Sequence, residues 1–173
     1  IHLAGGNIID ARIHTTRDGL ALDNFLVQDP LGRPFAETTQ IERLKQAIRS
    51  ALTDRARMTS GLLAKPMVRT RAEAFRIEPS AIIDNNASNR FTVIEVNAQD
   101  RPALLYQLAF ALFQSRVTIH SAHIATYGER AVDTFYVTDL LGHKVDGKAR
   151  MRALEARLIE AVSGAGTLSG AAA

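Results

Sequence analysis

The chain has 173 residues, of which 46% are hydrophobic and 23% are charged, with a net charge of +3 and no cysteine. This composition is typical of folded globular domains and excludes an intrinsically disordered or fibrous chain. The lack of cysteine excludes disulfides, thiolate metal sites and cysteine nucleophiles. No apolar run approaches the roughly 18 residues that a spanning helix needs, so we expect a cytoplasmic protein without a membrane partner.

Basic residues gather between Arg43 and Arg76, as they also do in proteins that bind nucleic acid. Acidic residues such as Asp54 and Glu73 interrupt this run. The mixed charge favours a solvated helix face followed by a linker, and we expect no nucleic-acid partner.

An internal repeat is the strongest pattern in the chain. Residues 7–15 and residues 118–126 share one apolar alternation. After a turn that is one residue shorter in the second copy, residues 23–29 align with residues 133–139, and Gly32 falls on Gly142. Repeats of this kind indicate two copies of one small structural unit.

The first copy opens with a predicted β-hairpin over residues 7–29, whose turn is Arg17-Asp18-Gly19. Apolar residues then recur at helical spacing from Ile41 to Leu52 and predict a helix. Residues 53–71 read as a linker, either one that carries a movement between modules or a passive connector. A strand near residues 75–84 is expected to close this first module.

The second copy shows what precedes the hairpin. Its expected order is β-α-β-β-α, with a strand over 91–97, the loop Asp100-Arg101-Pro102, a helix over 105–113, a hairpin over 118–139 that turns at Tyr127-Gly128-Glu129, and a helix over 151–162. Pro102 suits the first turn of a helix, and Asp100 can accept the free amides there. A helix cap and a ligand contact require the same position and residue type, so both roles stay open for Asp100.

The first copy begins only a few residues before its hairpin, so we expect a module truncated at its N-terminus, in a piece cut from a longer chain. In a ferredoxin-like βαββαβ sheet the first strand is central. Without it, the hairpin over 7–29 is predicted to have an unpaired edge, through which a homo-oligomer would form. The tail over 163–173 is too rich in glycine and alanine to predict a further strand. The expected domains are a partial first module over 1–84 and a second module over 85–173.

These features resemble a tandem of ACT domains, the small α+β βαββαβ modules that bind amino acids and control attached enzymes. Asp100-Arg101-Pro102-Ala103-Leu104-Leu105 is similar to their ligand-loop motif. The segments Ile9-Asp10-Ala11-Arg12-Ile13, Thr15-Thr16-Arg17-Asp18-Gly19 and Ile82-Ile83-Asp84-Asn85, in this order, resemble the C-terminal region of bifunctional uridylyltransferase/uridylyl-removing enzymes. That likeness covers nearly the whole chain.

The resemblance implies a regulatory role in bacterial nitrogen control. Enzymes of this family uridylylate the PII signal protein when glutamine is scarce and deuridylylate it when glutamine is plentiful, and their ACT pair resembles a glutamine sensor. Their catalytic domains, which need a divalent metal such as magnesium, would lie outside this chain. We expect no catalytic or metal site and no cofactor here. Strand alternation predicts opposite faces for His120 and His123, and the acidic residues Asp10, Asp84, Asp100 and Asp133 show no paired spacing.

A glutamine zwitterion needs an anion for its ammonium group, amides for its carboxylate and polar side chains for its side-chain amide. From the resemblance and from helix-end electrostatics, we expect Asp100 to face the ammonium group and the amides of Ala103 and Leu104 to bind the carboxylate. Asn97 or Gln99 would read the side-chain amide. A strand of the neighbouring module would form the second wall of the ligand site. The candidates for this wall are Asn7 and Ile8 in the first copy and Thr118 and Ile119 in the second.

Two observations keep interpretations other than a glutamine site open. Ala103 stands where the family often has glycine, and its methyl group would narrow the approach to the backbone. For the set Asn7, Ile8, Thr118 and Ile119, plain strand structure is the interpretation that the sequence favours over a ligand wall. The alternative function is a structural dimerisation module that has no ligand of its own.

Overall fold

A computed structural model of the chain describes residues 1–53 and 77–163. The elements are η1 (His2–Ala4), β1 (Asn7–Thr15), β2 (Ala21–Gln28), α1 (Thr38–Thr53), β3 (Ser80–Asp84), β4 (Thr92–Gln99), α3 (Leu104–Gln114), β5 (Val117–Tyr127), β6 (Arg130–Asp139) and α4 (Lys148–Val162). The fold is α+β and is compatible with ferredoxin-like modules in tandem, as predicted. The linker expected over 53–71 lies, apart from Thr53, outside the described residues.

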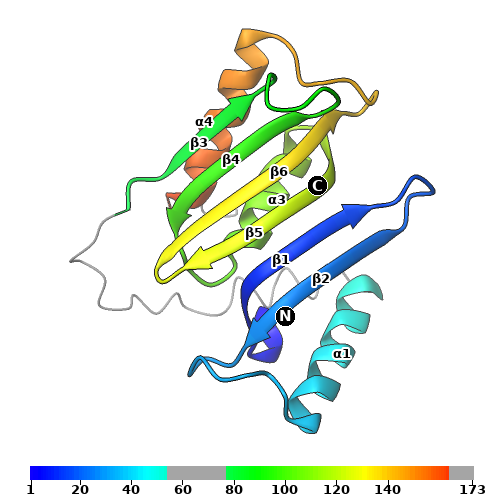
Figure 1. The fold of residues 1–173 in the computed structure, drawn as a ribbon, viewed down its shortest axis with the longest axis vertical. Helices are drawn as coiled ribbons and strands as arrows, with labels where there is room; N and C mark the ends of the chain where they lie inside the picture. Colours follow the sequence, from blue (N-terminus) through cyan, green and yellow to red (C-terminus); the bar gives the residue numbers. More distant parts are fainter. Residues whose placement is uncertain (54–76, 164–173) are drawn as a thin grey trace.

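The strands form one six-stranded antiparallel sheet in the order β2-β1-β5-β6-β4-β3 (Figure 1). Both predicted hairpins are present, as β1–β2 and β5–β6, and the order β4-α3-β5-β6-α4 confirms the order expected for the second copy. Helices α3 and α4 pack against each other and cover one face of this half of the sheet. No helix in the described ranges is long and apolar enough to cross a membrane.

The strand expected near residues 75–84 exists as β3, but it does not close the first module as expected. It pairs with β4, from Ser80 opposite Asn97 to Asp84 opposite Val93, and so extends the second half of the sheet instead of closing the first module. The cause is local. A short turn leads from β3 into β4, and the free backbone groups on that side of β4 need a partner. The division into domains 1–84 and 85–173 stays a prediction.

The first hairpin has one edge inside the sheet and one at its end. Strand β1 pairs with β5 in antiparallel register, from Asp10 opposite Ala125 to His14 opposite Ser121. Strand β2 is the end strand, and its outer side has no strand partner in the part of the chain that the structure describes. The unpaired edge expected for the hairpin therefore belongs to β2, and oligomerisation through it stays a prediction.

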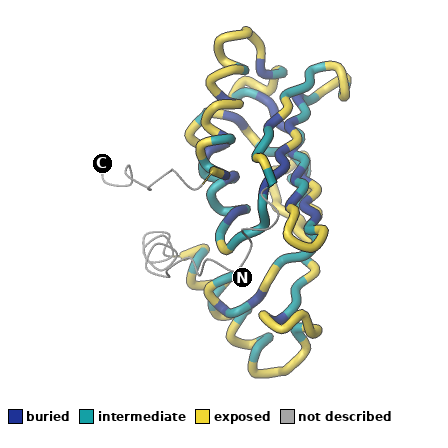
Figure 2. The backbone as a smooth tube through the Cα atoms, turned by 90° about the vertical axis from the view of Figure 1, so that its left-hand side faces the viewer, coloured by how far each residue is buried: buried dark blue, intermediate teal, exposed yellow. Residues whose placement is uncertain are grey.

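The core lies between the sheet and the pair α3 and α4. Leu108 and Leu112 of α3, Leu158 of α4 and Phe135 of β6 are fully buried or nearly so, and each such side chain contributes roughly 1.5–3 kcal/mol by leaving water. Helix α1 has no buried residue. Figure 2 shows this contrast, with buried positions concentrated beneath α3 and α4 and sparse along β2 and α1.

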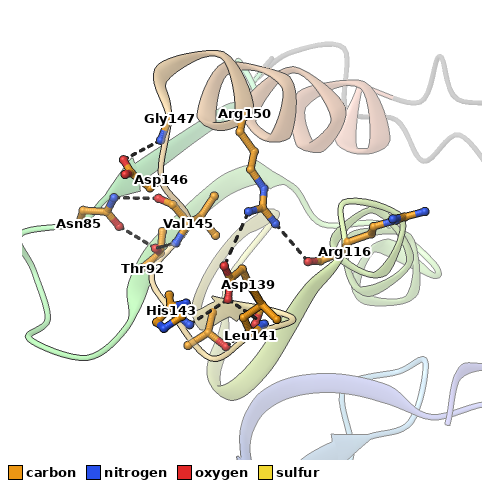
Figure 3. A network of polar contacts seen from close by, with 11 residues as sticks. Asn85, Thr92, Arg116, Asp139, Leu141, His143, Val145, Asp146, Gly147 and Arg150 are labelled. Carbon is orange, nitrogen blue, oxygen red and sulfur yellow. Dashed lines mark hydrogen bonds and ion pairs between the residues drawn. The ribbon is translucent and has the colours of Figure 1, made fainter.

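A polar network fixes the loop that leads from β6 into α4 (Figure 3). The Asp139 carboxylate accepts the N–H groups of Leu141 at 2.9 Å and His143 at 2.8 Å. The Thr92 hydroxyl donates to Asn85 at 2.6 Å and accepts the N–H of Val145 at 2.8 Å. The bonds of Thr92 satisfy polar groups at least partly removed from solvent, and those of Asp139 fix the exposed turn after β6.

Candidate ligand-binding site

A cavity of about 880 Å³ lies where the first hairpin and α1 meet the loop between β4 and α3. This volume is within the range of small-molecule sites. Its walls come from η1, the start of β1, Phe25 of β2, one side of α1, the loop over 100–103, the start of α3 and the helix-facing side of β5 and β6. The repeat thus places one copy against the other around a shared cavity.

The loop over 100–103 is fixed at both ends. The N–H of Asp100 donates to the carbonyl oxygen of Glu129 at 2.7 Å, and the N–H of Leu104 donates to the carbonyl oxygen of Arg101 at 3.1 Å. The Arg101 guanidinium donates to the carbonyl oxygen of Ala161 at 2.6 Å, which ties the loop to the end of α4. The loop therefore presents its residues to the cavity from a defined backbone.

Helix α3 begins at Leu104, two residues after Pro102, and its N-cap is Ala103 with a φ of 63°. The N-cap makes no side-chain hydrogen bond, so of the two roles left open for Asp100, the structure does not show the cap. A φ in the left-handed region favours glycine and strains alanine, so the backbone here suits the glycine that the resemblance leads us to expect at this position. Asp100 is one of the residues that line the cavity.

Two carboxyl groups line the cavity, those of Asp100 and Asp133. Burial raises the pKa of Asp100, against a smaller opposing effect of a backbone hydrogen bond at Arg101. Asp133 is 2% exposed, and burial followed by the nearby charge of Asp100 raises its pKa to about 7, opposed by a backbone hydrogen bond from Ala125. Its Oδ1 has no hydrogen-bond partner in the described structure. The site thus holds two carboxyl groups that favour a cationic ligand group.

Of the predicted residues, the structure brings Asp100, Ala103, Leu104, Asn7 and Ile8 together at the cavity wall. The Leu104 amide is already engaged by Arg101, so the amides that α3 offers next are those of Leu105 and Tyr106, which also line the cavity.

The other predicted residues do not line the cavity. Asn97 is 7% exposed, accepts from the Arg130 guanidinium at 2.6 Å and donates to Glu95 at 2.9 Å. Gln99 pairs with Arg130 on that same face of β4, since Ala98 between them points into the core. Thr118 and Ile119 lie at the opposite end of β5 from Ile124 and Thr126, which do line the cavity.

Sequence reasoning missed Asp133 as a site residue, although a signal for it was present. Along β6, Ala131, Phe135 and Val137 are buried at alternate positions, and Asp133 stands in the same register. A carboxyl group at a core-facing position is costly and is often functional. Sequence spacing gave no sign that Asp100 and Asp133 line one cavity, because the fold brings together residues that are distant in sequence.

The expected opposite orientation of His120 and His123 was wrong. A bulge between Ile119 and Ser121 interrupts the alternation of β5. His120 contacts Thr138 at 2.9 Å, and His123 pairs with Thr134, so both imidazoles lie on the open face of the sheet. No group of three or more metal-ligating side chains gathers within residues 1–53 and 77–163.

The chain is similar to segments of much longer curated proteins. It is 69% identical over 161 residues to the bifunctional uridylyltransferase/uridylyl-removing enzyme of Novosphingobium aromaticivorans, 57% identical to that of Erythrobacter litoralis and 56% identical to that of Zymomonas mobilis. These alignments cover 93–95% of this chain but only 18% of each relative.

No family model matches the chain, and no solved structure matches it. The identity to the curated relatives, 56–69% over 161–166 residues, agrees with the resemblance to these enzymes. Over nearly all of its length, the chain is similar to a segment of bifunctional uridylyltransferase/uridylyl-removing enzymes, of which it spans about a fifth.

Proposed function

We propose that the chain is the glutamine-sensing regulatory segment of a bifunctional enzyme that uridylylates and deuridylylates the PII signal protein in nitrogen control. The observation that carries the proposal is the cavity between the two copies, which combines the Asp100 carboxylate with the N-terminus of α3. The high identity to enzymes that carry both uridylyl activities in their names supplies the context.

The cavity suits an α-amino acid in its zwitterionic form. The carboxyl groups at one wall favour the ammonium group, and the first amides of α3, at Leu105 and Tyr106, together with the helix dipole favour the carboxylate. The α1 wall adds Gln46 and Arg43. Because Asn97 and Gln99 face away, we assign the recognition of the side-chain amide to Gln46.

A sensor also needs a ligand that binds one arrangement of its parts better than another. The cavity is lined from both copies, with Asn7 and Ile8 on one side and Asp100 on the other. A ligand in it would therefore contact both modules at once, and its affinity would depend on how they sit together. On this proposal the segment is regulatory, and catalysis with its divalent metal takes place in other parts of the longer enzyme.

The test is a calorimetric titration of the chain with L-glutamine, with L-glutamate and L-alanine as controls. We expect selective binding of L-glutamine, and at least tenfold weaker binding by Asp100→Ala. Asp10→Ala is the matched control, because Asp10 is a partly exposed carboxylate on β1 that does not line the cavity. The absence of heat with all three amino acids would overturn the proposal.

A structural dimerisation module is the second candidate function, and the end strand β2 favours it. Leu22 and Leu26 of this strand are 67% and 58% exposed, beside backbone groups that have no strand partner among the described residues. Exposed strand edges of this kind pair with other chains. Light scattering over a range of protein concentrations tests this candidate, and a monomer at all concentrations would exclude it for this chain.

A further inference from the structure

Asp133 occupies a position that packing alone does not explain. It lies on β6 between the core residues Ala131 and Phe135, opposite Val96 of β4 and Ile124 of β5. Its carboxyl group lines the cavity, and its Oδ1 is buried without a hydrogen-bond partner in the described structure. A buried polar atom without a partner destabilises the fold, so its presence at the cavity wall points to a group that arrives from outside the fold.

The charges around Asp133 define what that group would be. The charge that acts on it is that of Asp100, which has the same sign. The other charged or titratable groups at the cavity are Arg101 in the loop, Arg43 on α1, Tyr106 on α3, and His2 with the amino group of Ile1 near η1. Burial, the charge of Asp100 and a backbone hydrogen bond from Ala125 shift the pKa of Asp133, and no cationic side chain is among these causes. A small cationic group is the complement that the two carboxyl groups favour.

We propose that Asp133 and Asp100 together form the recognition point for the α-ammonium group of the amino-acid ligand, and that the ligand binds with the release of a proton from this pair. The proposal rests on the function proposed above and adds to it a specificity residue and a linkage to pH. An ammonium group has three N–H donors and no acceptor, so it can donate to both carboxyl groups at once, and it is held most strongly when both are ionised.

The proton balance follows from the pKa of about 7 for Asp133. Below this pH the carboxyl group is mostly neutral, and a bound ammonium group favours its ionised form, so binding releases up to one proton to solvent. Above it, both carboxylates are ionised in the free protein and no proton is released. Affinity should therefore rise about tenfold per pH unit below pH 7 and level off above it.

The test uses the 173-residue chain, L-glutamine as the ligand and calorimetry between pH 5 and pH 8.5. We expect Asp133→Asn to weaken binding at pH 8 at least tenfold and to abolish the tenfold-per-unit dependence below pH 7. Asp23→Asn is the matched control, because Asp23 is the repeat equivalent of Asp133, is exposed on β2 and does not line the cavity. N-acetyl-L-glutamine, which has no ammonium group, should not bind.

Proton release gives a second measurement that does not depend on a variant. Titrations of the unmodified chain at pH 6 in phosphate and in imidazole, whose heats of ionisation differ, should report about one proton released, and those at pH 8.5 should report none. Equal affinity of Asp133→Asn and the unmodified chain, or no proton release at pH 6, would overturn this proposal and leave glutamine sensing intact. No glutamine binding by the unmodified chain would overturn both.

Discussion

The two repeat copies differ in burial more than in backbone. Each is a hairpin followed by a helix. The aspartates at the ends of the two hairpins, Asp29 and Asp139, each accept the backbone N–H groups of the residues two and four positions later. Yet Phe135 is 1% exposed whereas its equivalent Phe25 is only partly buried, and α1 buries no residue whereas α4 buries three.

The difference comes from the neighbours of each copy. Strand β4 and helix α3 pack on the β5–β6 hairpin and complete its core. In the described chain the cavity, and not a second core, lies where the first hairpin and α1 meet the loop between β4 and α3. A hairpin's pattern therefore specifies which face can be buried, while the elements packed on it decide whether that face becomes a core or a binding surface.

The largest effect should come from truncating the equivalent phenylalanines. Phe135→Ala should lower the free energy of unfolding by about 3–5 kcal/mol, because it leaves a cavity in a close-packed core. Phe25→Ala removes a side chain that borders an existing cavity, and should cost clearly less. Urea denaturation measures both, and equal losses would show that the two copies are packed alike.

The next effect is the pH dependence of stability that Asp133 imposes. Its pKa is raised in the fold from an ordinary value of 3.8 to about 7, so the folded chain binds more protons than the unfolded chain within that window. Stability should fall as pH rises from about 4 to about 7, by at most about 1.4 kcal/mol per unit, and then level off. Asp133→Asn should remove this slope, and urea denaturation at several pH values measures it.

Asp23→Asn serves as the control for that measurement, since the equivalent residue is exposed. Its pH profile should match that of the unmodified chain. A slope that persists in Asp133→Asn would mean that another group carries the proton.

A smaller loss of stability, of the same size in both copies, is expected from substitutions in the equivalent turns that follow the two hairpins. Gly32 and Gly142 have φ values of 76° and 85°, and a Cβ atom at either position would meet no neighbour within 4 Å. Alanine at each should therefore cost only the left-handed backbone strain, about 1 kcal/mol. Thermal unfolding of Gly32→Ala and Gly142→Ala should show similar losses, and a difference well beyond this value would contradict the equivalence of the turns.

The smallest effect on stability is expected at the end of the sheet. Leu26→Glu replaces an exposed side chain and should change the free energy of unfolding by less than about 0.5 kcal/mol. It should nevertheless reduce self-association through β2, as measured by sedimentation. Leu141→Glu, an exposed leucine in the loop after β6, should leave both quantities unchanged.

Much of the second copy could be predicted because each of its elements buries one face. The apolar residues of each element therefore recur at the spacing typical of a strand or of a helix. The partner of β3 could not, because alternation over five residues does not say which strand edge lies beside it. The bulge that turns His120 was equally invisible, since a single extra residue leaves no compositional mark.

The candidate site was predictable in part. Resemblance and helix-end chemistry identified Asp100, and the cavity contains it. Asn97 and Gln99 were proposed because they are close to the loop in sequence. Ala98 between them is buried in the core, so strand alternation places both on the face away from the cavity. Asp133 could be read from its register, but its partnership with Asp100 depends on how β6 and the loop meet in space.

The antiparallel pairing of β1 with β5 has a consequence for the order of folding. Its paired residues are about 110 positions apart in the chain, whereas β3–β4 and β5–β6 join neighbours. Contacts of such long sequence separation require the closure of a large loop and form slowly. We expect the half over 80–162 to fold first and to serve as the template on which β1 docks, so the ligand cavity would be the last part of the molecule to take shape.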